Sequence, residues 1–148
     1  MQHGKKKPSP WESFFVHNVD YHQNHGLTGK LKAGIDFIYS AEACSKLNTL
    51  LLAQRPDIVH FHNIYHQLTP ALIGVAKRFG CKTVLTAHDY KIVCPSYTML
   101  RDGHVCDDCL TGSVSNAFRH RCQQGDTFKS LLLSLEAYWQ KFAQNYAM

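Results

Sequence analysis

The segment from residue 55 to residue 87, RPDIVHFHNIYHQLTPALIGVAKRFGCKTVLTA, decides the fold. It holds two short apolar runs, residues 57–62 and 82–87, that are typical of strands, with a periodic stretch between them that predicts a helix. Thr69 is the expected N-cap of that helix and Pro70 its first residue. Strands joined through a helix by short connections are parallel, with a right-handed crossover, so the segment predicts an α/β domain.

Two further helices are predicted on either side of this segment. Apolar residues recur at three- and four-residue steps over residues 35–51, and again over residues 128–146, where Asp126 or Thr127 is the expected cap. We expect the apolar stripe of the last helix to pack against the sheet or a partner domain. Peripheral contact with a membrane is the alternative, although its polar face is not strongly basic. Residues 14–16 are short and apolar enough for a strand.

The composition is that of one soluble domain. The chain has 148 residues, of which 45% are hydrophobic and 18% charged, and its formal net charge is +5. That charge favours anionic partners without choosing among them. No apolar run approaches the roughly 20 residues of a membrane-spanning helix. Because no apolar region follows the basic residues 5–7, no secretory signal is predicted and a cytoplasmic location is expected, with the inner membrane face as an option.

Polar side chains follow both predicted strands. His62 and Asn63 leave the first strand, and His88, Asp89 and Lys91 leave the second. Ligands of open parallel sheets bind beyond the carboxyl ends of the strands, so the two groups are expected to converge on one cleft. Imidazole and carboxylate groups can hydrogen-bond sugar hydroxyls, and histidine or lysine can stabilise charge developing on a phosphate leaving group.

Two more histidines lie close to the first of these groups. Side chains alternate along a strand, so His60 is expected to face the same side as His62, opposite Val59 and Phe61. His66 follows in the connection to the next helix and is a further candidate for substrate binding. A lone histidine at a strand end is more often a polar filler, and for His60 alone we favour that interpretation.

The segment from residue 92 to residue 126 interrupts the α/β pattern as an irregular insertion with four cysteines. Cys94, Cys106, Cys109 and Cys122 have the spacing C-x11-C-x2-C-x12-C. Four thiolates suit tetrahedral zinc in a closed structural site, and such a staple would explain how an insertion without its own core folds. An iron–sulfur cluster, a redox pair and unligated thiols are the alternatives. The remaining cysteines, Cys44 and Cys81, are expected in or near the core.

The strings RPDIVHFHNIYHQLTPALI (residues 55–73) and TVLTAHDYKIVCPSY (residues 83–97) closely resemble the N-terminal domain of family-four glycosyltransferases. More narrowly, they resemble a bacterial subgroup that carries a cysteine-bearing insertion after HDYK. The resemblance covers roughly residues 35–146, and its motifs agree in order and spacing. It implies the GT-B architecture, in which two Rossmann-like domains face a cleft. The N-terminal domain holds a glycan or lipid-linked acceptor, and the C-terminal domain holds the nucleotide-sugar.

The resemblance also implies roles for individual residues. Transfer in the family retains the anomeric configuration and needs no catalytic metal. By position, His88 would lie against the donor sugar and phosphates with Asp89 beside it, as the catalytic pair. His62 would lie on the acceptor side, and the remaining expected substrate-binding residues are Asn63, His66 and Lys91.

This sequence departs from the family pattern at both ends. The strand, glycine-rich loop and helix with which family members begin are not recognisable, and neither is their closely spaced pair of glutamates. We therefore interpret residues 1–148 as a single incomplete acceptor-side domain. It would lack the donor-binding domain and have little or no transferase activity alone.

Two other classes of function compete with this interpretation. A metal-dependent hydrolase could use the HFH and HD histidines, but most such folds need a complete barrel of about 250 residues. A basic, zinc-bearing nucleic-acid-binding module would fit the charge and the CxxC. Its basic residues, however, are scattered and not gathered beside the cysteines, so no nucleic-acid partner is expected.

Overall fold

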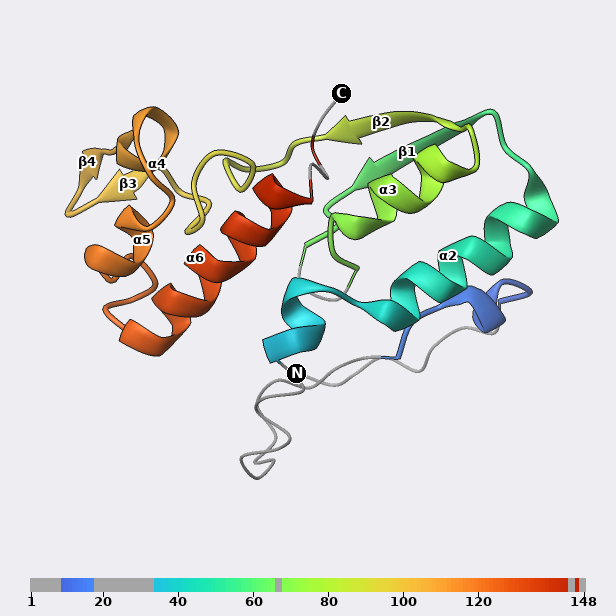
Figure 1. The fold of residues 1–148 in the computed structure, drawn as a ribbon, viewed down its shortest axis with the longest axis horizontal. Helices are drawn as coiled ribbons and strands as arrows, with labels where there is room; N and C mark the ends of the chain where they lie inside the picture. The colour runs from blue at the N-terminus through green and yellow to red at the C-terminus, as the bar shows by residue number, and fades with distance from the viewer. Residues whose placement is uncertain (1–8, 18–33, 66–67, 144–145, 147–148) are drawn as a thin grey trace.

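The structure is a computed structural model that describes residues 9–17, 34–65, 68–143 and 146 (Figure 1). A strand–helix unit lies at one end, the cysteine-bearing insertion at the other, and the last helix between them. In chain order the elements are η1 (Glu12–Phe14), α2 (Ala41–Gln54), β1 (Ile58–His62), α3 (Ala71–Arg78), β2 (Lys82–Thr86), β3 (Leu100–Arg101), β4 (His104–Val105), α4 (Asp108–Thr111), α5 (Asn116–Arg119) and α6 (Thr127–Phe142).

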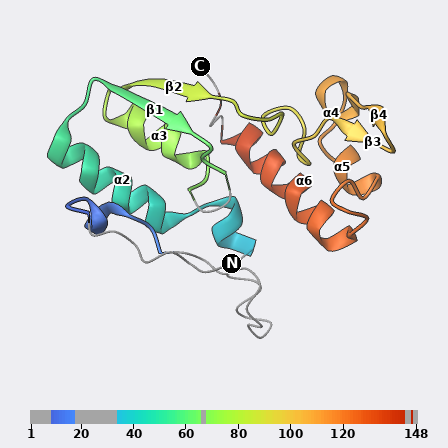
Figure 2. The ribbon, with the colours of Figure 1, turned by 180° about the vertical axis from the view of Figure 1, so that it is seen from behind.

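The predicted parallel sheet is confirmed. β1 pairs with β2 in parallel, in a register that places His60 opposite Val84 and His62 opposite Thr86. Helices α2 and α3 lie on one side of this sheet, as the two opposite views show (Figures 1 and 2). On β1 the buried residue Phe61 stands between two exposed histidines, so the strand has one covered and one open face. This is the arrangement of a partial Rossmann-like α/β fold.

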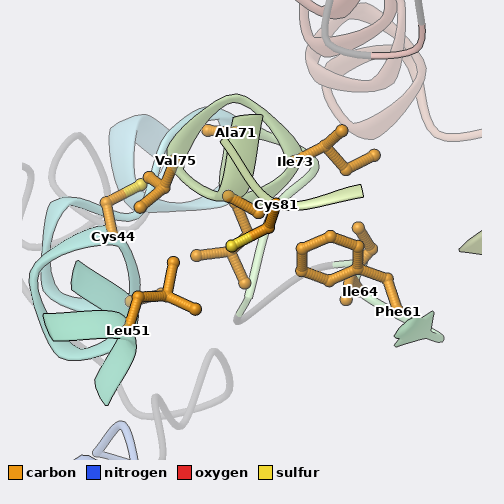
Figure 3. Packing of buried hydrophobic residues seen from close by; sticks show 11 residues of the cluster. Cys44, Leu51, Phe61, Ile64, Ala71, Ile73, Val75 and Cys81 are labelled. Carbon is orange, nitrogen blue, oxygen red and sulfur yellow. The ribbon is translucent and has the colours of Figure 1, made fainter. Parts of the chain in front are cut away.

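The core fills the space between α2, α3 and the covered face of the sheet (Figure 3). Leu51 and Cys44 enter it from α2, Val75 from α3, and Phe61 from β1. Cys81 lies at the start of β2, where its thiol donates to the carbonyl of Pro56 over 3.2 Å. Cys44 and Cys81 are therefore core residues, as predicted.

Several helix starts differ from the predictions. Residues 34–38 are helical, but the helical conformation is interrupted at residues 39 and 40. Helix α2 begins after Ser40, whose side chain accepts a hydrogen bond from the amide of Ala43. Thr69 does not cap α3. It adopts a left-handed φ of 56°, and its hydroxyl accepts from the amide of Ser40 over 3.4 Å, tying two helix starts together. Asp126 caps α6 as expected, and its carboxylate accepts from Lys129.

The prediction of a strand over residues 14–16 is wrong, because residues 12–14 form the short 3-10 helix η1 beside α2. The insertion is more ordered than its sequence indicates. It contains the β3–β4 hairpin and the short helices α4 and α5, and α5 packs on α6.

Helix α6 is confirmed, but the face that it buries is not the predicted one. Most of the predicted apolar stripe stays exposed, with Phe142 at 82%, whereas Leu133 beside it is buried. The buried face is mainly polar and hydrogen-bonded: Ser134 donates to the carbonyl of Val114, and Gln140 to that of Ile38. Through these small and polar side chains α6 packs against the segments that contain Val114 and Ile38. Most of the apolar stripe is left on the surface. Among the helices of the described residues, none has the length and apolar character to cross a membrane.

Candidate functional site

The open face of β1 carries the first half of the candidate site. His60 and His62 lie on the same side of the strand with ring centroids 4.1 Å apart, as alternation predicts. The ring of His60 shares a hydrogen bond of 2.8 Å with the hydroxyl of Thr86, the last residue of β2. His60 is thus held as a polar bridge between the two strands.

The second half is His88, two residues beyond the end of β2. Its Nε2 lies 3.2 Å from Nδ1 of His62, and the ring centroids are 5.5 Å apart. The pair forms because β1 and β2 are adjacent and parallel. Their carboxyl ends, where His62 and His88 lie, are therefore at the same edge of the sheet. One ring must donate its proton and the other accept, so the contact couples the tautomers of the two histidines.

The backbone turns sharply after each histidine. Asn63 has a φ of 48°, a left-handed conformation that asparagine tolerates better than most residues, and the chain bends there directly after His62. After β2, the carboxylate of Asp89 accepts from the backbone amide of Lys91 over 2.9 Å, which fixes the turn that carries His88. His66 lies outside the described residues.

Lys91, a predicted substrate-binding residue, has its side chain turned toward α6. Its side chain is only 4% exposed, and Nζ lies 2.7 Å from Oε2 of Glu136 on α6, whose side chain is 5% exposed. The same ammonium group donates to the carbonyl of Pro95 over 3.0 Å. Lys91 therefore anchors the turn that follows His88 and Asp89 to α6 instead of facing the site.

The buried Tyr65 and the half-buried Tyr146 lie close to this ion pair. Burial raises the pKa of Tyr65, and the carboxylates of Asp89 and Glu136 raise it further. Burial likewise raises the pKa of Tyr146, with Glu136 as the next cause. Among the described residues the Tyr65 hydroxyl has no hydrogen-bond partner. Both phenols stay neutral beneath the site, and the Lys91 ammonium is the cation that faces Glu136.

The sequence analysis did not identify Glu136 or Tyr65 as neighbours of Lys91. Glu136 falls on a helical stripe that reads as solvent-facing, and Tyr65 falls in a loop. The only available signal was the string HDYK itself, in which a lysine follows an expected strand end by a fixed turn. That signal locates Lys91 in the sequence but does not say which partner it meets.

The four cysteines of the insertion come together in the structure. Cys94, Cys106, Cys109 and Cys122 all line one small cavity, together with residues of β3 and α4. Burial raises the pKa of the Cys109 thiol to about 11, and the three neighbouring thiols reinforce the shift. Across the described residues, no three histidine, cysteine or acidic side chains stand in a ready-made metal-binding arrangement.

The side chains at this edge can therefore offer hydrogen bonds, and those within the described residues form no ready-made metal centre. Two imidazoles in contact can donate to or accept from hydroxyl groups, and either ring can take up a proton. Asp89 and Asn63 add polar groups at the same edge of the sheet. The cavity lined by the four cysteines lies in the insertion. The insertion's elements lie on the other side of α6 from β1 and β2 (Figures 1 and 2).

Comparison with known proteins gives one informative similarity. Over 89 residues the chain is 33% identical to a glycogen synthase of Chlorobium luteolum, and the match covers 53% of this chain and 18% of that protein. No family model and no solved structure matches the chain. The chain thus spans under a fifth of the length of this relative, and over the matched stretch it is similar to a glycosyltransferase.

Proposed function

We propose that this chain provides the acceptor side of a retaining GT-B glycosyltransferase of family four, which moves a sugar from a nucleotide-sugar to a glycan or lipid-linked acceptor. The observation that carries the proposal is the contact between His62 and His88 at the carboxyl edge of two adjacent parallel strands. The similarity to a glycogen synthase supports the same class of reaction.

Each candidate residue has a proposed role. His62, Asn63 and His66 would bind acceptor hydroxyls, while His88 and Asp89 would lie nearest the reacting sugar. In the transfer, the bond between the sugar C1 and the phosphate oxygen breaks and a bond from C1 to the acceptor oxygen forms. The acceptor loses its hydroxyl proton, and the nucleotide leaves with negative charge that a nearby imidazolium would stabilise. Lys91 would act as a positioning residue for the turn at His88 and Asp89.

The nucleotide-sugar is proposed to bind to a second domain. The matched stretch is under a fifth of its relative, so a separate donor-binding part agrees with the comparison. The exposed apolar face of α6 offers a surface on which such a domain could pack, and peripheral membrane contact through the same face is the alternative. A chain without the donor domain would show little or no transfer.

Acceptor binding tests this proposal on the chain itself. A malto-oligosaccharide stands in for a glucan acceptor, and a short-chain prenyl-phosphate sugar for a lipid-linked one. We expect one of them to bind and to shift the ring resonances of His62 and His88 in NMR spectra. Each of His62→Ala and His88→Ala should weaken binding by about 2- to 10-fold, the loss of one net hydrogen bond of about 0.5–1.5 kcal/mol.

His104→Ala in the β3–β4 hairpin is the matched control, because His104 belongs to the insertion and lies apart from the strand ends. It should leave binding unchanged. The proposed acceptor site would be contradicted if neither acceptor bound to the folded chain. It would also be contradicted if binding were unchanged in both His62→Ala and His88→Ala.

A further inference from the structure

The cavity lined by four cysteines is the strongest unexplained feature of the insertion. Its thiols come from four separate places: Cys94 from the segment after β2, Cys106 from the end of the hairpin, Cys109 from α4, and Cys122 from the turn after α5. Cys94 and Cys109 are each only 9% exposed. Segments that are up to 28 positions apart in the sequence (Cys94 to Cys122) thus place thiols around one small space.

The insertion has little else to hold it together. Its buried apolar residues are few, and cysteines are prominent among them: Cys94, Pro95, Cys109, Val114 and Ala117. Its backbone also turns often, with left-handed φ angles at Tyr97, Met99, Asp102, Arg121 and Gln124 in addition to two glycines. A segment of this kind cannot bury enough apolar surface to offset the entropy lost on ordering its loops. It needs a cross-link.

We propose that Cys94, Cys106, Cys109 and Cys122 bind one structural zinc ion as four thiolates. The proposal does not rest on sugar transfer, because the site lies in the insertion and uses none of the residues at the strand ends. Binding replaces four S–H bonds with four S–Zn bonds and releases the protons to solvent, without oxidation or reduction. The thiols are not yet arranged as a ligand set, so binding requires them to rotate toward the cavity that they already share.

The groups around the thiols suit the charge of such a site. Zinc with four thiolates carries a net negative charge, and the guanidinium of Arg101 lies close enough to Cys106 and Cys122 to interact with both. Arg101 is itself held by an ion pair with Asp108, and the ring of His120 lies 3.6 Å from the same carboxylate. Charged and hydrogen-bonding groups that surround metal ligands orient those ligands, and Arg101 with its partners would do so here.

A closed set of four sulfur ligands favours zinc over the other candidates. Tetrahedral sulfur sites take zinc or iron–sulfur clusters, and magnesium, calcium and manganese prefer oxygen. The cavity lies between short elements and is small, which fits a single ion better than a cluster of several iron and sulfide atoms. Disulfides would join the thiols in pairs, whereas one ion uses all four thiols around the space that they share.

The test is metal analysis of the full chain purified without chelator from medium containing both zinc and iron. We expect about one equivalent of zinc by mass spectrometry. In the native protein two of the six cysteines, Cys44 and Cys81, should then remain outside the site. Cys109→Ser and Cys106→Ser should each lose most of the zinc. Cys44→Ser and Cys81→Ser, the matched controls, should retain it because both residues lie in the core of the strand–helix unit.

A second measurement protects the test against variants that fail to fold. Cobalt added to the metal-free wild-type chain should saturate at one equivalent, give the absorption bands of tetrahedral thiolate coordination, and be displaced by zinc. Three results would each overturn the proposal. These are iron with acid-labile sulfide in the purified chain, a disulfide among the four cysteines, and a folded chain that neither contains zinc nor binds cobalt. Equal zinc content in Cys109→Ser and Cys44→Ser would also overturn it.

Discussion

Replacing Lys91 with methionine should lower the free energy of unfolding by about 3–5 kcal/mol, as expected when one partner of a buried ion pair is removed. Methionine keeps most of the side-chain volume but leaves the Glu136 carboxylate, 5% exposed, without its ammonium partner. The carbonyl of Pro95 also loses its donor. Unfolding in urea, followed by circular dichroism, measures the difference.

Two comparisons separate the buried pair from a general charge effect. Lys129→Met removes a lysine whose nitrogen lies 3.9 Å from Asp126 on the surface, and it should cost under about 1 kcal/mol. The double variant Lys91→Met/Glu136→Leu should recover much of the lost stability, because it leaves no unpaired charge. If Lys91→Met were as stable as Lys129→Met, Lys91 would not be the anchor that the structure shows.

Replacing Phe61 with alanine should lower the free energy of unfolding by a similar amount, about 3–5 kcal/mol. Phe61 is 5% exposed and fills the core between β1 and the helices (Figure 3). It also fixes the face on which the histidines appear, since its burial forces His60 and His62 to the opposite side of β1. Loss of Phe61 should therefore loosen the His62–His88 contact as well as the core.

Phe142→Ala on α6 is the control for removing a phenylalanine. That side chain is 82% exposed, so its loss should change stability by at most about 0.5 kcal/mol. Urea unfolding again gives the free energies, and His62 ring resonances report the effect on the site. Equal stability losses for Phe61→Ala and Phe142→Ala would show that β1 is not packed as described.

The strand–helix–strand unit was predictable because its signals are local. Alternation along β1 predicts that His60 and His62 share one face, opposite Phe61, and adjacency of parallel strands predicts that His62 and His88 converge. Both predictions are confirmed. The grouping of the four cysteines follows less directly, because spacing alone indicates ligands but not that their segments share a cavity.

The other features depend on partners far away in the sequence. The apolar period of α6 predicts a buried stripe, but the helix packs through Ser134 and Gln140, whose polar atoms find backbone carbonyls in segments that sequence periodicity does not reveal. Lys91 is a predicted substrate-binding residue, and its pairing with Glu136 does not follow from the sequence. Thr69 has the residue type of an N-cap, but its hydroxyl instead joins a neighbouring helix start at Ser40.

The contact between the His62 and His88 rings is tested most directly by proton–proton NOEs between assigned imidazole resonances of the folded chain. His62→Gln and His88→Gln provide the assignments. Ring centroids 5.5 Å apart should give a cross-peak between His62 and His88, beside one between His60 and His62, whose centroids are 4.1 Å apart. A His88 ring that shows NOEs to neither histidine, in chain that retains the His60–His62 cross-peak, would contradict a shared site at the ends of β1 and β2.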